Sequence, residues 1–152
     1  MPTKGQPFPD FALPTQDGKT ITLADLRGKK VIIFAFPKAN TTGCTAQACG
    51  FRDSFPQLNV SNAVVLGLSP DAQKDLKKWK DKEGLGYDLL SDMDKTLLTT
   101  LGVWQEKSMY GKKYMGVVRS HWVLDEQGVV MDEQIKVSPE ESVKRALAAV
   151  SA

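Results

Sequence analysis

FPKANTTGCTAQAC, residues 36–49, is the stretch of sequence that decides the fold. It follows the apolar run VIIFAF, residues 31–36, whose β-branched and aromatic side chains predict a buried strand. Pro37 ends that strand, because proline removes a donor from the hydrogen-bond ladder. The small polar residues that follow suit a loop leading into a helix, and helical spacing then continues through Ala48, Phe51, Phe55 and Leu58. The pattern therefore places Cys44 in the first turn of a helix, at the carboxyl end of a central strand.

This position favours reactivity at Cys44. A helix N-terminus carries roughly half a positive charge and several unpaired N–H groups, and both stabilise a thiolate over a thiol. An ordinary cysteine has a pKa of about 8.5, so only a small fraction is ionised at neutral pH without such help. The alternative is a buried structural cysteine, which is the commoner fate of a lone Cys. The local pattern favours the nucleophile.

The composition is that of one ordinary globular domain spanning residues 1–152. Hydrophobic residues make up 41% of the chain and charged residues 25%, and the net charge is +2 from 20 basic and 18 acidic residues. That balance predicts neither a nucleic-acid partner nor a membrane partner. No stretch is long enough to span a bilayer, and residues 1–7 lack the apolar core of a signal peptide, so we expect a cytoplasmic protein.

Cysteine usage supports a redox role. Two cysteines in a reducing compartment are more readily catalytic or redox-active than structural. With the single histidine they are too few for the usual structural zinc set, so we expect no metal and no cofactor. His121, on a predicted strand beside Trp122, is interpreted as structural rather than as half of a Cys–His catalytic pair. The residues alone leave the roles of His121 and Gln47 open.

Strand and helix patterns alternate along the chain. Residues 8–23 are typical of an amino-terminal hairpin with a turn at 16–19, and residues 23–28 of a helical turn. The helix that holds Cys44 is expected to kink or end at Pro56. The patterns that follow predict a strand at 63–69, a helix from Ser69 to Gly84, a strand at 88–90, a helix at 94–101, a mobile loop at 110–114, a strand at 116–125, a hairpin at 127–131 and a helix from Ser138 through Val150. This order predicts an α/β fold, a thioredoxin-like three-layer sandwich with an amino-terminal β-hairpin.

Residues in the opening stretch also carry a family resemblance. Pro37, Thr41 and Cys44 form Pro-x-x-x-Thr-x-x-Cys, which resembles the active-site pattern of the peroxiredoxins. Cys49, five residues later, resembles the resolving cysteine of the Q-type, or bacterioferritin comigratory protein, subfamily. The resemblance extends over nearly the whole chain, from residues 8–11 to Arg119 and Ser120. The chain departs from it at Phe36, Thr42 and Gln47, where tyrosine, proline and an acidic residue are common.

This resemblance implies an antioxidant thiol peroxidase with the peroxiredoxin fold. Hydrogen peroxide or an organic hydroperoxide would oxidise Cys44 to a sulfenic acid, and Cys49 would resolve it as an intramolecular disulfide. Thioredoxin or a similar dithiol would then reduce the disulfide, and the subfamily is often monomeric. Two alternatives remain, a general thiol–disulfide oxidoreductase and a non-catalytic redox sensor. The first of these usually carries Cys-x-x-Cys, whereas four residues separate the two cysteines here.

The chemistry of peroxide reduction assigns roles to the same residues. The thiolate attacks one peroxide oxygen, so donors must bind both oxygens and follow the charge onto the leaving one. Arg119 is a permanent cation with a fixed fork of donors, and Thr41 can orient the peroxide through its hydroxyl. Backbone N–H groups near Gly43 and Cys44 complete the substrate-binding cradle, and Pro37 shields the sulfur from water. The alternatives are that Thr41 only caps the helix and that Arg119 only pairs with a carboxylate.

The spacing of the two cysteines predicts a conformational change. Five residues of intact helix advance about 7.5 Å along the axis, which places the Cα atoms of Cys44 and Cys49 roughly 8–9 Å apart. A disulfide tolerates a Cα separation of only about 7 Å. We therefore expect at least one turn that holds Cys49 to unwind before the disulfide forms. Gly50 and Pro56 both weaken the helix at this place.

Overall fold

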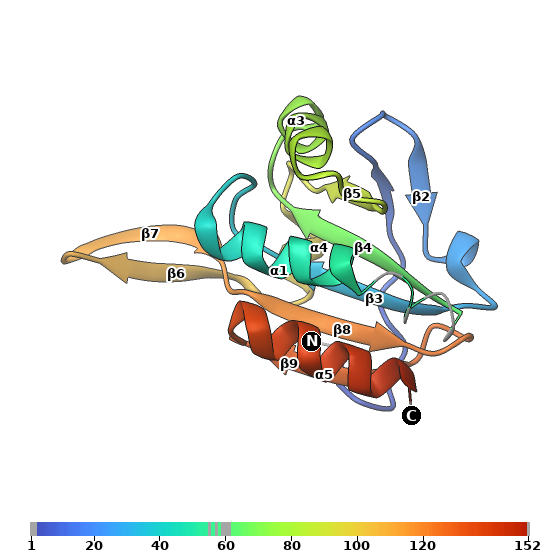
Figure 1. The fold of residues 1–152 in the computed structure, drawn as a ribbon. Coiled ribbons are helices and arrows are strands. Elements are labelled where there is room, and N and C mark those ends of the chain that lie inside the picture. The colour runs from blue at the N-terminus through green and yellow to red at the C-terminus, as the bar shows by residue number, and fades with distance from the viewer. Residues whose placement is uncertain (1–2, 55, 57, 59–61, 152) are drawn as a thin grey trace.

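The computed structural model describes residues 3–54, 56, 58 and 62–151. Its centre is a five-stranded sheet in the order β5-β4-β3-β8-β9 (Figure 1). Strands β3, β4 and β5 run parallel, whereas β8 runs antiparallel to β3 and β9 antiparallel to β8. Their bounds are β3 Lys30–Ala35, β4 Ala63–Ser69, β5 Asp88–Ser91, β8 Ser120–Leu124 and β9 Val130–Ile135. The predicted central strand therefore has neighbours on both sides.

Helices cover both faces of this sheet. Helices α1 (Thr42–Asp53), α3 (Gln73–Glu83) and α5 (Pro139–Ser151) pack on one face, and α4 (Thr96–Thr100) packs on the other (Figure 1). The side chains of β3 alternate between the two faces, and every residue from Val31 to Ala35 is buried. Burial on both sides explains why the central strand is a continuous apolar run rather than an alternating one. This arrangement confirms the predicted three-layer α/β sandwich.

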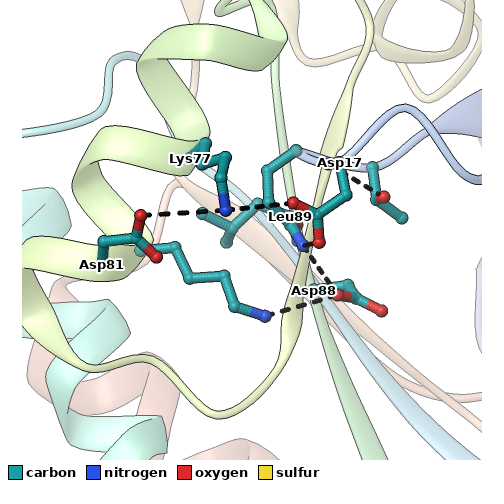
Figure 2. Close-up of polar contacts among 8 residues, drawn as sticks. Asp17, Lys77, Asp81, Asp88 and Leu89 are labelled. Atoms are coloured by element: carbon teal, nitrogen blue, oxygen red, sulfur yellow. Dashed lines mark hydrogen bonds and ion pairs between the residues drawn. The ribbon is translucent and has the colours of Figure 1, made fainter.

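The amino-terminal hairpin is also confirmed. Strands β1 (Ala12–Pro14) and β2 (Thr20–Thr22) pair antiparallel, and the 3-10 turn η1 (Ala24–Leu26) follows. Its turn is fastened to α3 and β5: Lys77 Nζ lies 3.2 Å from Asp17 Oδ1, and Gln16 Nε2 donates to Asp88 Oδ1 at 2.9 Å (Figure 2). The backbone N–H of Leu89 donates to Gln16 Oε1, also at 2.9 Å. These contacts hold the hairpin against the edge strand of the sheet.

Two predicted elements differ from the structure. Helix α3 begins at Gln73 with Ala72 as its N-cap, not at Ser69. Ser69 is instead the last residue of β4, and its hydroxyl donates to Asp71 Oδ2 at 2.9 Å. The predicted strand 116–125 is two strands, because β7 (Lys112–Val117) leaves the main sheet to pair with β6 (Trp104–Met109). Local alternation cannot reveal a change of pairing partner between two strands.

The predicted loop at 110–114 is part of that second hairpin. Tyr110 and Gly111 form its turn, with φ angles of 53° and 79°, and residues 112–114 belong to β7. The hairpin projects beyond α1 from the body of the molecule (Figure 1). Tyr110 at its tip is almost fully exposed.

Helix α1 ends earlier than the proline at which we expected a kink or an end. Its last residue is Asp53, and Ser54 is the C-cap. The Ser54 hydroxyl donates to the Gly50 carbonyl at 2.8 Å, and the N–H of Leu58 donates to the Ser54 carbonyl at 3.1 Å. Leu58 is buried in the same core cluster as the inward side chains of α1, whereas Phe55 lies outside the described residues.

Candidate active site

Cys44 is the third residue of α1, directly beyond the carboxyl end of β3. Its side chain is 1% exposed, and both cysteines are free thiols. The first helical hydrogen bond runs from the N–H of Thr45 to the Thr41 carbonyl. The N–H groups of residues 42–44 therefore have no carbonyl partner within the helix. This geometry confirms the predicted position of Cys44 at a helix N-terminus, where backbone donors can serve an anion.

Arg119 reaches this helix terminus from the neighbouring strand of the sheet. It lies in the break between β7 and β8, and Ser120 pairs with Ala35 at the end of β3. Because β3 and β8 are antiparallel, the amino end of β8 lies beside the carboxyl end of β3. The guanidinium Nη2 donates to Cys44 Sγ at 3.3 Å. Within the part of the chain that the structure describes, Arg119 therefore pairs with the thiol and with no carboxylate.

Gln47 supplies the other contact of the guanidinium. It lies three residues after Cys44, on the same face of α1, and its side chain is fully buried. Arg119 Nη1 donates to Gln47 Oε1 at 2.8 Å. Position 47 is where an acidic residue is common in the family, so here a neutral amide holds the arginine instead of a carboxylate.

Thr41 and Pro37 belong to the loop that enters the helix. Thr41 is the N-cap residue by backbone geometry, but its side chain makes no capping bond. Its hydroxyl donates to the Lys38 carbonyl at 2.9 Å, so its oxygen lone pairs are free to accept a hydrogen bond from a substrate O–H. Pro37 is half-buried directly after β3. The loop is fastened by the N–H of Ala39, which donates to Asp71 Oδ2 at 2.7 Å.

Asp71 and Lys107 are two residues near the site that sequence reasoning missed. Asp71 follows β4, and the parallel pairing of β3 with β4 brings it beside the loop. Lys107 lies on β6, half-buried. Burial lowers the pKa of Lys107, and the charge of Arg119 lowers it further, whereas Cys44 raises it. Lys107 therefore lies within electrostatic reach of both Arg119 and Cys44. The sequence did not indicate this, because the position of Lys107 depends on the pairing of β6 with β7.

Cys49 is on the same helix but in different surroundings. Its Sγ is 3.6 Å from Glu83 Oε2 on α3 and donates to it, and Arg52 Nη1 donates to the Glu83 carbonyl. Burial raises the pKa of the Cys49 thiol, and Glu83 raises it further, against the opposing charge of Arg52. The structure thus brings Cys44 and Arg119 together and leaves Cys49 half-buried against another helix.

Within residues 3–54, 56, 58 and 62–151, no group of three or more His, Cys, Asp or Glu side chains could hold a metal ion. Among the helices of that same part of the chain, none is both long enough and apolar enough to cross a bilayer.

The sequence matches the AhpC/TSA family over residues 4–133. It is 44% identical over 135 residues to a putative peroxiredoxin of Mycobacterium tuberculosis, covering 89% of this chain and 86% of that protein. It is 39% identical over 143 residues to peroxiredoxin Bcp of Bacillus subtilis, covering 94% and 91%, respectively.

Solved structures give the same family. The bacterioferritin comigratory protein of Xanthomonas campestris, whose structure was described for its alkyl peroxide reduction activity, has a TM-score of 0.87 at 31% identity. The match covers 93% of this chain and 90% of that one. BcpB of Mycobacterium tuberculosis has a TM-score of 0.88 at 31% identity, over 99% and 97% of the two chains. The predicted resemblance and fold are therefore confirmed: the chain belongs to the AhpC/TSA family and is a peroxiredoxin of the Bcp, or peroxiredoxin Q, type, a thiol-dependent peroxidase.

Proposed function

We propose that this peroxiredoxin reduces hydrogen peroxide and organic hydroperoxides with Cys44 as the peroxidatic cysteine. The observation that carries the proposal is the 3.3 Å contact between Arg119 Nη2 and the buried Cys44 Sγ at the start of α1. A permanent cation and a helix N-terminus both favour negative charge at that sulfur. The alkyl peroxide reduction described for the Xanthomonas campestris relative supports the choice of substrates.

The oxidation step uses the groups already assembled around the sulfur. The Cys44 thiolate attacks one peroxide oxygen, the O–O bond breaks, and the other oxygen leaves as hydroxide or alkoxide and takes up a proton. Cys44 becomes a sulfenic acid, and the peroxide is reduced by two electrons. Arg119 and the free N–H groups of residues 42–44 stabilise the charge as it moves onto the leaving oxygen. Thr41 accepts a hydrogen bond from the peroxide, and Pro37 shields the sulfur.

Cys49 is the resolving cysteine in this proposal. Its thiol attacks the sulfenic sulfur of Cys44, a disulfide forms, and water is released. The raised pKa of Cys49 keeps it protonated while the peroxide reacts at Cys44, so the two thiols do not compete for substrate. Thioredoxin or a similar dithiol then reduces the disulfide by thiol–disulfide exchange and restores both thiols.

We also propose that the enzyme acts as a single-domain monomer in the cytoplasm. All of the residues assigned to catalysis come from one chain: Pro37, Thr41, Cys44, Cys49 and Arg119. The site is therefore complete without a second copy. Sedimentation at micromolar concentration should give the mass of one chain, and a dimer would contradict this part of the proposal.

Steady-state peroxide turnover with thioredoxin tests the chemical assignment. Cys44→Ser should abolish turnover, because a hydroxyl is far less ionised than a thiol at neutral pH. Cys49→Ser should still consume one equivalent of peroxide per chain but should fail to turn over with thioredoxin. Normal turnover by Cys44→Ser, together with an inactive Cys49→Ser, would reverse the two roles.

A further inference from the structure

A chain of hydrogen bonds runs from Arg119 through buried side chains to Asp132 on β9. Arg119 Nη1 donates to Gln47 Oε1, and Gln47 Nε2 donates to Ser142 Oγ, both at 2.8 Å. Ser142 Oγ lies 2.8 Å from His121 Nδ1, and His121 Nε2 lies 2.9 Å from Asp132 Oδ2. Gln47, Ser142 and His121 are fully buried, whereas the Asp132 side chain is 24% exposed. The chain links α1, α5, β8 and β9.

The donors and acceptors of this hydrogen-bond chain fix the orientation of Gln47, and the direction at His121 depends on the tautomer of its ring. A guanidinium only donates, so the Gln47 oxygen must face Arg119 and its NH₂ group must face Ser142. The Ser142 oxygen then accepts from Gln47, and it donates its own proton to His121 Nδ1 when that nitrogen carries no proton. At the other ring nitrogen the carboxylate of Asp132 can only accept, so His121 Nε2 donates to it. That hydrogen bond is the main cause that lowers the pKa of Asp132.

This direction determines what Arg119 can do. A buried amide that loses its partners is left unsatisfied, so Gln47 does not rotate freely while Ser142, itself hydrogen-bonded to His121, accepts from its NH₂ group. Its oxygen and the Cys44 sulfur then give the guanidinium one acceptor for each terminal nitrogen. Gln47 is neutral. The only carboxylate among these five hydrogen-bonded residues is Asp132, at the end opposite Arg119. The positive charge of Arg119 is consequently left for the sulfur and the leaving oxygen.

We propose that Ser142 and His121 are positioning residues for peroxide reduction. They act through Gln47 and hold Arg119 so that Nη2 faces Cys44. The inference rests on the proposed roles of Cys44 and Arg119, and adds two residues that touch neither the sulfur nor the substrate site. It also gives the sole histidine of the chain a part in the reaction without a Cys–His catalytic pair.

Stopped-flow oxidation of Cys44 in a Cys49→Ser background tests the proposal. Ser142→Ala removes the link and should slow oxidation by about tenfold, less than the roughly 10²-fold expected when the charged stabiliser itself is lost. Ser142→Thr keeps the hydroxyl and should recover most of the rate. The matched control is Tyr87→Phe, which removes a buried hydrogen bond of 2.7 Å to the Ala48 carbonyl on the same helix. It should remain within twofold of the parent.

The pH profile separates positioning from stability. A guanidinium that no longer faces the sulfur stabilises the thiolate less, so the oxidation rate of Ser142→Ala should rise at higher pH than that of the parent. Tyr87→Phe should lower the melting temperature without moving this profile. A folded Ser142→Ala with the parent rate and profile would overturn the proposal. If Cys44→Ser still turned over peroxide, the assignment of Cys44 would fail instead, so the two failures are distinguishable.

Nuclear magnetic resonance tests the direction of these hydrogen bonds in the unaltered protein. His121 is the only histidine, so its ring nitrogen signals need no further assignment. The proposed direction requires a proton on Nε2 and an unprotonated Nδ1 that accepts from Ser142. A ring with its proton on Nδ1 would overturn the proposed polarity, even if Ser142→Ala failed to fold. Arg119→Met should shift the His121 signals, whereas unchanged signals would show that Arg119 and His121 are not coupled.

Discussion

The Cβ that an alanine would place at Gly43 lies 3.0 Å from Arg119 Nη2. Gly43 has no positive φ angle, so its backbone does not require glycine. What the site uses is the missing side chain, because the guanidinium passes over this position to reach Cys44. The approach of Arg119 to the sulfur thus depends on the size of the residue directly before the cysteine.

We predict that Gly43→Ala separates activity from stability. Alanine improves helix propensity by up to about 1 kcal/mol, so the melting temperature should stay the same or rise. The added methyl should move Nη2 by a few tenths of an ångström and slow Cys44 oxidation by about three- to tenfold, in line with the strong dependence of rates on position. Thr42→Ala, in the same helical turn but exposed, is the control. An unchanged oxidation rate in Gly43→Ala would contradict the steric argument.

Substitution of Arg119 should slow Cys44 oxidation more than the substitutions at Gly43 and Ser142. Arg119→Met keeps the aliphatic stem but removes the charge, and should slow sulfenic acid formation by roughly 10²-fold or more. Arg119→Lys keeps the charge but cannot contact Gln47 and Cys44 with two fixed nitrogens. Its oxidation rate should therefore fall between those of Arg119→Met and the wild type. Stopped-flow rates for Arg119→Met within a factor of two of the wild type would remove this residue from the site.

Glu83 should control the ionisation of the second cysteine. Removing its negative charge with Glu83→Gln favours the thiolate, so the pKa of Cys49 should fall. In a Cys44→Ser background, iodoacetamide should therefore alkylate Cys49 at lower pH than in the parent, as followed by mass spectrometry. Asp81→Asn is the control, because Asp81 is on the same helix but contacts Lys77 (Figure 2). The idea fails if both variants show the same alkylation profile.

Disulfide formation should unwind the second half of α1. The sequence predicted unwinding from the distance between the Cα atoms of Cys44 and Cys49, and the structure shows what this unwinding would disrupt. A Cβ at Gly50 would lie 2.8 Å from Val143 Cγ2, so α1 and α5 approach closely at this point. Unwinding the turn that holds Cys49 therefore breaks this packing of α1 against α5 as well as the Cys49–Glu83 contact. Amide hydrogen exchange over Gln47 to Asp53 should be slow in the reduced protein and faster in the oxidised one, with β4 as the unchanged control. Equal protection in both states, with a Cys44–Cys49 bond confirmed by mass spectrometry, would exclude this unwinding.

The position of Cys44 at the start of α1 followed from the sequence alone. Strand, loop and helix around Cys44 are encoded by neighbours: an apolar run, a proline that cannot donate, and inward side chains at helical spacing. The amino-terminal hairpin was predicted for the same reason, since alternation and turn residues act within a few positions of one another. Such features depend on local backbone preferences and the burial of one face, which a short window of sequence contains.

Tertiary structure decided which distant groups surround Cys44. Arg119 contacts Cys44 across 75 residues, and Gln47 contacts Ser142 across 95. The first contact depends on the pairing of Ala35 with Ser120 and on the break before β8, which the sequence pattern predicted as one continuous strand. The second depends on how closely α5 packs against α1 at Gly50. Register and helix approach are set by the packing of whole elements against one another, so no local pattern contains them.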